Sequence, residues 1–306
     1  MSQVEYTAQD FELVGIKEDQ TDILSQKTTS FWGQVFHTFA RNKLALFSVA
    51  LLAVIALLAI FVPMFWPISF SDQTGSYNTA PNATYLFGTD NLGRDVFVRV
   101  WVGARISLFI GLIAAVIDLV IGVLWGATAG VLGGRVDDVM MRIADVLTAL
   151  PYLLVVVLVM VVLDKGLLPM IVALSLTGWV RMARIVRGEV LSIKNQEYVL
   201  ASRTLGASTW HLIRRHLIPN ALGGIIVTMT LSIPGAIFTE SFLSYLGLGV
   251  TQPMASWGTM ASEGNEALAT APWRLVFPAL LISITIFAFN TIGDGLRDAL
   301  DPKLRK

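Results

Sequence analysis

Two carboxylic acids inside apolar stretches are the residues of this chain that could carry chemistry in a membrane. Asp118 and Glu240 each interrupt a long apolar run. An ionisable side chain at such a place is costly, and is therefore a functional candidate by default. Asp118 heads a row with Gly122, Gly126 and Gly130, and small residues at four-residue spacing let helices approach closely. We expect Asp118 to be a protonated or hydrogen-bonded packing residue, with a cavity-lining role as the alternative.

Placing Glu240 in the membrane is expected to cost less free energy than placing Asp118 there, because Glu240 lies closer to a membrane surface. It lies 21 residues beyond Pro219, or about 31 Å along a helix. That distance predicts a position near the outer mouth of its span. Pro234 lies in the middle of the same span and predicts a bend. Asp118, Pro234 and Glu240 are the candidates for a pathway through the membrane, although packing alone could explain the bend.

A third group of charges has helical spacing. Asp138, Arg142 and Asp145 stand at positions i, i+4 and i+7, so the arginine could pair with both carboxylates along one helix face. We interpret this set as self-neutralising structure near the inner interface.

Several kinds of chemistry are missing from the sequence. It contains no Walker A motif, no metalloprotease motif, no cysteine and three scattered histidines. We therefore expect no enzyme activity, no metal site and no cofactor bound by this chain. The 22 basic and 22 acidic residues give a net charge of zero, which argues against a nucleic-acid partner. The oxygen-rich segment Phe87–Asp95 lacks EF-hand spacing, so we expect a structural turn there.

The composition indicates what kind of elements hold Asp118 and Glu240 in position. Hydrophobic residues make up 55% of the 306 residues and charged residues 14%, against about 25% in soluble domains. The mean hydropathy is +0.67. A soluble domain could not hide so much apolar surface, so the excess faces lipid. The sequence predicts an all-α integral membrane protein with six transmembrane helices, at 44–66, 105–129, 139–163, 167–183, 217–243 and 275–292.

The remaining segments complete the expected organisation. A polar, acidic cytoplasmic tail covers 1–29, and 30–43 has the spacing of an interfacial amphipathic helix. Segment 67–103 is extracytoplasmic, 104–296 forms a core with five of the spans and a cytoplasmic loop at 184–216, and 297–306 is a cytoplasmic tail. With the N-terminus inside, 17 of the 22 Lys and Arg residues fall on the cytoplasmic side, as the positive-inside rule requires.

The cytoplasmic loop 184–216 is patterned rather than featureless. Residues 197–205 predict a short helix that Gly206 terminates, and Ser208 can cap a second short helix through Arg215. Pro219 then falls near the first turn of the next span, where proline is tolerated. The pattern indicates a compact knob of helix, glycine turn and helix.

This loop resembles the EAA loop of ABC importer permeases. Ala201, Gly206 and Pro219 match the motif in register. The sequence departs from the motif at four positions, which are Leu200 for the glutamate, Ser202 for the second alanine, His216 for the isoleucine and Ile218 for the leucine. The segments 87–95, 241–249 and 293–303 resemble the dipeptide and oligopeptide branch, and are most similar to C-type subunits of Gram-positive oligopeptide permeases.

The resemblance implies a fold, partners and a cargo. It implies the type I ABC importer permease fold, in a multi-pass protein of a bacterial plasma membrane with both termini cytoplasmic. The implied partners are a homologous B-type permease, two ABC ATPase subunits that bind ATP and Mg, and an extracytoplasmic peptide-binding protein. The implied cargo is oligopeptides, with dipeptides, nickel chelates or glutathione as alternatives, and a non-transporting scaffold or channel as a distant one. The implied ATPase-docking residues are Glu197, Leu200, Ala201, Ser202, Arg203, Gly206, Ala207 and Pro219.

Overall fold

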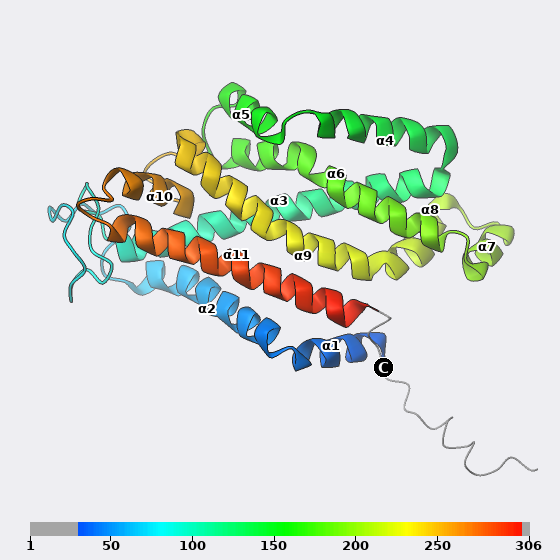
Figure 1. Cartoon of the computed structure of the whole chain (residues 1–306), viewed down its shortest axis with the longest axis horizontal. Helices are drawn as coiled ribbons and strands as arrows, with labels where there is room; N and C mark the ends of the chain where they lie inside the picture. The colour runs from blue at the N-terminus through cyan, green and yellow to red at the C-terminus, as the bar shows by residue number, and fades with distance from the viewer. Residues whose placement is uncertain (1–29, 302–306) are drawn as a thin grey trace, which may run out of the picture.

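The computed structural model describes residues 30–301, and every regular element in that range is a helix (Figure 1). The predicted tail 1–29 and residues 302–306 lie outside the described residues. The helices are α1 (Phe31–Arg41), α2 (Lys43–Phe65), α3 (Val96–Leu132), α4 (Gly134–Ala149), α5 (Tyr152–Val162), α6 (Leu167–Ile193), α7 (Glu197–Thr204), α8 (Thr209–Leu212), α9 (Ile218–Leu243), α10 (Trp257–Glu266) and α11 (Trp273–Leu300). Two short π-helices, η3 (Ile213–Leu217) and η4 (Ser244–Leu248), flank α9.

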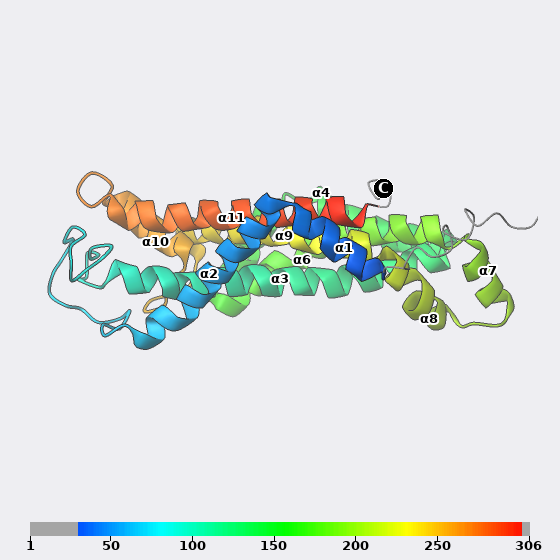
Figure 2. The same ribbon diagram turned by 90° about the horizontal axis from the view of Figure 1, so that it is seen from below.

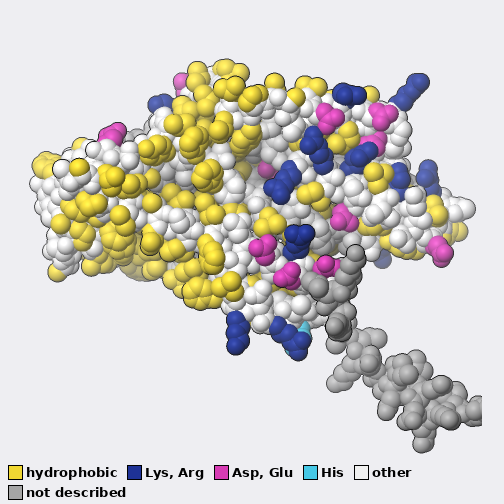
Figure 3. Space-filling model, in the orientation of Figure 1, with side chains coloured by type: hydrophobic (Ala, Val, Ile, Leu, Met, Phe, Trp, Pro, Cys, Tyr) yellow, Lys and Arg dark blue, Asp and Glu magenta, His cyan; other side chains and the backbone are white. Residues whose placement is uncertain are grey.

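Five helical stretches within the described residues are long and apolar enough to cross a membrane: α2, α3, α6, the α8–η4 stretch and α11. The bent pair of α4 and α5 makes a sixth if it counts as one span. Figures 1 and 2 place α10 at one end of the long axis and α7 and α8 at the other. On the face drawn in Figure 3, hydrophobic side chains cover the part toward α10, and charged side chains gather toward α7 and α8. This face is thus apolar toward α10 and charged toward α7 and α8.

The predicted third span, 139–163, is divided between two helices, α4 and α5, because the chain bends in its middle. The axes of α4 and α5 meet at 82°. Proline disfavours helical geometry at the residue before it, and Leu150, which precedes Pro151, is extended with φ −75° and ψ 134°. The break therefore has a local cause that the sequence carried.

Pro63 inside α2 leaves a different mark on the packing. It has no N–H, so the carbonyl of Ala59, four residues earlier, loses its helical partner. In an apolar surrounding such a carbonyl needs another donor. Arg105 of α3 supplies it, because its Nε donates to Ala59 O at 2.5 Å and its Nη2 donates to Ile60 O at 2.6 Å. A proline on one helix thus fixes an arginine on the next.

The glycine row of α3 forms the closest helix contact. A Cβ added at Gly122 would lie 2.5 Å from Cβ of Met182, and one at Gly130 would lie 2.7 Å from Cγ1 of Val190. Both neighbours belong to α6, so α3 and α6 pack almost backbone to backbone. The predicted packing face is confirmed, and it continues at its Asp118 end, where Gly178 of α6 lies against the carboxylate.

The second knob helix is not separate, contrary to prediction. Ser208 caps it, accepting a hydrogen bond from His211 N at 3.3 Å. The helix then runs through η3 directly into α9, and Pro219 sits in the first turn of α9. α9 also continues across Pro234. A rigid connection therefore joins the knob to a membrane-spanning helix.

Candidate functional site

The end of the molecule formed by α7 and α8 carries an exposed knob. α7 begins at Glu197 as predicted, and the chain reverses at Gly206, which has φ +88°. Only glycine adopts that conformation at little cost. Leu205 is 88% exposed and Trp210 58% exposed. Exposed apolar side chains beside a turn that favours glycine are features of a protein-docking surface.

Buried apolar side chains attach the knob to the bundle, and most of the predicted docking residues are exposed. Val199 is buried, and Leu212 and Leu217 join it in one apolar cluster that holds the knob to the bundle. A surface depression of about 500 Å³ follows the turn, lined by Ser202, Leu205, Gly206, Ala207, Ser208 and His211. Six of the eight predicted docking residues are exposed, namely Glu197, Leu200, Ala201, Arg203, Gly206 and Pro219.

A second depression of about 520 Å³ adjoins the knob, and it is basic. Arg214 and Arg215 line it together with Trp210 and His211. Its aromatic and arginine composition is that of protein-interface anchors.

Asp118 lies within the bundle and is incompletely satisfied. It packs against Gly178 of α6, and its Oδ1 is buried without a hydrogen-bond partner among residues 30–301. The hydroxyls of Ser175 and Thr177 on α6 are also buried and unpartnered in the described part of the chain. Buried polar groups without hydrogen-bond partners favour the entry of water or of a polar group of the cargo, which would supply the missing hydrogen bonds.

Glu240 lies in the last turn of α9, in agreement with the predicted depth, but the expectation of a low burial cost is wrong. Its side chain is fully buried. Ser107 of α3 donates to its Oε2 at 2.8 Å, and Ser244 donates to its Oε1 at 2.8 Å. The backbone N–H of Trp257 donates in turn to Ser107 Oγ at 3.2 Å. Glu240 thus ties α9, α3 and α10 together, which no spacing rule within one helix could reveal.

The predicted intrahelical set of Asp138, Arg142 and Asp145 is also wrong. Asp145 pairs with Arg184 of α6 at 2.9 Å, and Arg142 has no ion pair among residues 30–301. The neighbouring Asp137 accepts two hydrogen bonds from Arg187 of α6, at 2.5 and 2.6 Å. The bidentate pair bridges α4 and α6, because these helices face each other once the chain has turned at Gly133.

A cluster of buried charges at the α10 end was missed by the sequence analysis. Asp90 accepts from Arg94 Nε at 2.6 Å and lies 3.4 Å from Arg99 Nε. Both arginines also reach Glu263 of α10, at 3.4 and 3.5 Å. Arg274 donates to the carbonyl of Glu263 at 3.0 Å. The expected turn at 87–95 is present, and Asp90 holds it closed by accepting from backbone N–H groups. Its arginines extend toward a helix that lies more than 150 residues later.

Asp95 caps α3 beside this cluster. It accepts from Phe97 N at 2.9 Å and from the indole N–H of Trp66 at 3.0 Å. Burial raises the pKa of the Asp95 carboxyl above its ordinary value, and these hydrogen bonds offset part of that rise. The carboxyl joins the C-terminal end of α2 to the N-terminal end of α3.

Comparison with known proteins supports one family. Residues 122–306 match the family described as binding-protein-dependent transport system inner membrane component, and residues 30–83 match the N-terminal TM domain of oligopeptide transport permease C. The oligopeptide transport system permease protein OppC of Bacillus subtilis is 58% identical, with 97% of each chain covered. The dipeptide transport system permease protein DppC of the same organism is 53% identical over 95% of this chain and 91% of its own.

More distant comparisons agree. The OppC protein of Escherichia coli K12 is 42% identical over 94% of this chain and 96% of its own. A solved structure of the MetNI methionine ABC transporter, in an inward-facing conformation, matches with a TM-score of 0.55 at 20% identity. That match covers 67% of this chain and 96% of the other. At that identity the likeness concerns the fold alone.

Proposed function

The chain belongs to the family of binding-protein-dependent transport system inner membrane components, and from that premise we propose that it is the C-type membrane subunit of an ATP-driven importer of oligopeptides. The observation that carries the proposal is the likeness to an oligopeptide permease subunit over nearly the whole of both chains. Import of dipeptides is the second candidate, favoured by the dipeptide permease relative. The relatives are permease subunits rather than enzymes.

In this proposal the chain forms half of a translocation pathway. A homologous B-type permease forms the other half, two ABC ATPase subunits bind ATP and Mg, and an extracytoplasmic protein delivers the peptide. Asp118, Pro234 and Glu240 remain the pathway candidates. Asp118 is the strongest of them, because its carboxylate has an unmet oxygen. Glu240 acts through the helices that it joins.

The knob is the proposed ATPase-docking site. Leu205 and Trp210 would enter an apolar groove, and Ala201 leaves room for close approach. Movement of the knob would pass through α8 and η3 into α9 without a flexible joint. Closure of the ATPases would thereby tilt a membrane-spanning helix and alternate the access of the pathway. In the proposed orientation the knob and both termini are cytoplasmic, which agrees with the distribution of Lys and Arg.

Reconstitution of the complete complex in proteoliposomes tests the proposal. Uptake of labelled peptides of graded length is measured with and without ATP, beside a complex whose ATPase subunits carry an inactivating substitution. We expect uptake that requires active ATPases and extends to peptides longer than two residues. Uptake without ATP would refute the importer assignment, and uptake restricted to dipeptides would favour the second candidate.

A further inference from the structure

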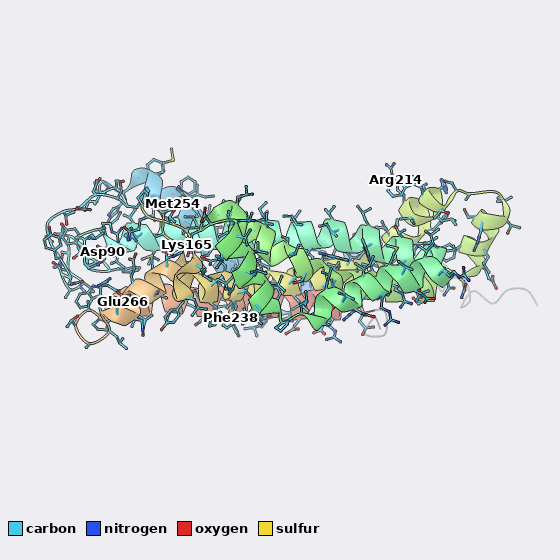
Figure 4. All side chains as sticks on the ribbon, turned by 90° about the horizontal axis from the view of Figure 1, so that it is seen from above. Asp90, Lys165, Arg214, Phe238, Met254 and Glu266 are labelled. Atoms are coloured by element: carbon cyan, nitrogen blue, oxygen red, sulfur yellow. The ribbon has the colours of Figure 1, made fainter. Side chains whose placement is uncertain are left out.

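A cavity at the α10 end belongs to no part of the coupling knob. It encloses about 340 Å³ between the α5–α6 loop and the segment that follows α9. The volume is at the lower end of small-molecule sites, which span roughly 300–1,000 Å³. Among its lining residues are Lys165, Gly247, Thr251, Gln252, Ser262 and Glu263. Figure 4 labels Lys165 and Met254 at the end that holds Asp90, far from Arg214 of the knob.

Two ionisable side chains line this cavity, and their charges are not equally available. Glu263 is held from behind by Arg94 and Arg99, whose side chains are 4% and 1% exposed. Both arginines also pair with Asp90, so two buried cations face two carboxylates and the charge of Glu263 is balanced within this cluster. Lys165 is exposed and forms no ion pair among the described residues 30–301. The adjacent Asp164 does not line the cavity. The uncompensated charge on the wall is therefore the ammonium group of Lys165.

The rest of the cavity wall provides a hydrogen-bond donor and leaves room for a ligand. The hydroxyl of Thr251 forms no hydrogen bond in the described part of the chain, so it is free to donate. Gly247 lines the cavity with backbone, and no atom lies within 4 Å of the position its Cβ would take, so the space beside it is open. A cation with neighbouring donors complements a carboxylate, because hydrogen bonds between ionised partners are the strong ones.

We propose that this cavity receives the carboxylate of an incoming peptide, with the ammonium group of Lys165 as its charged contact. The inference rests on the proposed function, which makes a peptide the cargo. A free peptide always carries a carboxylate at its C-terminus, so such a site would act on peptides of any sequence. The contact would draw the peptide from the binding protein toward the membrane-spanning helices.

The test compares two peptides that differ only at that carboxylate. Uptake of an alanine pentapeptide is measured at saturating binding protein, with its C-terminus free or amidated, in proteoliposomes that hold the complete complex. The variants are Lys165→Gln, which removes the charge, Lys165→Arg, which keeps it, and Asp164→Asn as the matched control on the same loop. Affinity of the binding protein for each complex is measured separately.

We expect Lys165→Gln to slow uptake of the free-acid peptide by about five- to tenfold, which lies between the upper end of the range for an exposed ion pair and the lower end of the range for a hydrogen bond to a charged group. Uptake of the amidated peptide stays unchanged, and Lys165→Arg and Asp164→Asn behave like the unaltered chain. An equal loss for both peptides together with weaker binding of the binding protein would overturn the proposal, since the cavity would then be a docking site. Unchanged uptake of both peptides would also overturn it. Absence of uptake by the unaltered complex would instead refute the proposed function itself.

Discussion

Gly126 lies at the closest approach of α3 and α6, and replacing it with alanine should separate these helices. A Cβ at this position would lie 3.0 Å from both the carbonyl carbon of Ala183 and the nitrogen of Arg187, and closer still to the Ala183 oxygen. These are backbone atoms that no rotamer change can move. Ordinary contact begins at 3.4 Å, so the helices must part by at least about 0.4 Å. Overpacking of this kind costs about 1–3 kcal/mol.

Gly188 provides the matched control. It lies in α6, and a Cβ built there meets nothing within 4 Å. Gly188→Ala should therefore be neutral or raise the free energy of unfolding by up to about 1 kcal/mol, because alanine favours helix over glycine. Unfolding of the purified chain in mixed micelles by increasing SDS, followed by tryptophan fluorescence, measures both variants against the unaltered chain.

The expected result is a loss of about 1–3 kcal/mol for Gly126→Ala and no loss for Gly188→Ala. The two variants add the same methyl group to the same pair of helices, so the difference reports the contact alone. Equal stability of the two would refute the close packing of α3 on α6.

Four further predictions concern the knob and the polar contacts. Gly206→Val should reduce peptide uptake while ATP hydrolysis persists, whereas Gly206→Asn should retain uptake, because asparagine tolerates positive φ; normal uptake by the valine variant would contradict the coupling-turn assignment. Ala201→Arg should weaken co-purification of the ATPase subunits, and an undiminished yield would count against docking at this face. Asp137→Asn should lower the free energy of unfolding, and a double-mutant cycle with Arg187→Gln should give a coupling of about 1 kcal/mol for this partly buried pair; additivity would show that the pair contributes nothing. Because the pKa of Asp95 is raised in the folded state, the folded chain holds a proton on this carboxyl at pH values where the unfolded chain has lost it, so stability should fall as pH rises through that pKa. Asp95→Asn should flatten this pH dependence in unfolding measured between pH 4 and 7. Identical slopes for the variant and the unaltered chain would contradict the burial of this carboxyl.

Local patterns in the sequence were sufficient for much of the fold. The shortage of charge indicates a membrane protein, and the apolar runs locate its spans because about 20 residues are needed to cross the hydrocarbon. The row from Asp118 to Gly130 identifies a packing face, since residues four apart lie on one side of a helix. The helix at 197–204 and the turn at Gly206 also follow from local rules, because a cap and a positive φ involve neighbouring residues.

Contacts between segments that are far apart in the sequence could not be predicted from local patterns. Sequence spacing paired Arg142 with its own helix, whereas Asp145 pairs with Arg184 of another helix. The depth of Glu240 along its helix was computed well, but whether it faces water or protein depends on Ser107 and on the segment after α9. A periodicity describes one helix, and it carries no information about which helix lies opposite.

The sequence by itself determined that this chain spans a membrane and which family its cytoplasmic loop resembles. It also determined how the Lys and Arg residues are distributed between the two predicted sides of the membrane. Tertiary structure alone decided that Glu263 pairs with Arg94 and Arg99 and that Lys165 forms no ion pair within residues 30–301. The physical reason is that burial and charge pairing are properties of several helices at once. Hydrophobicity and helix signals are properties of single segments, and they can be read before any of those helices meet.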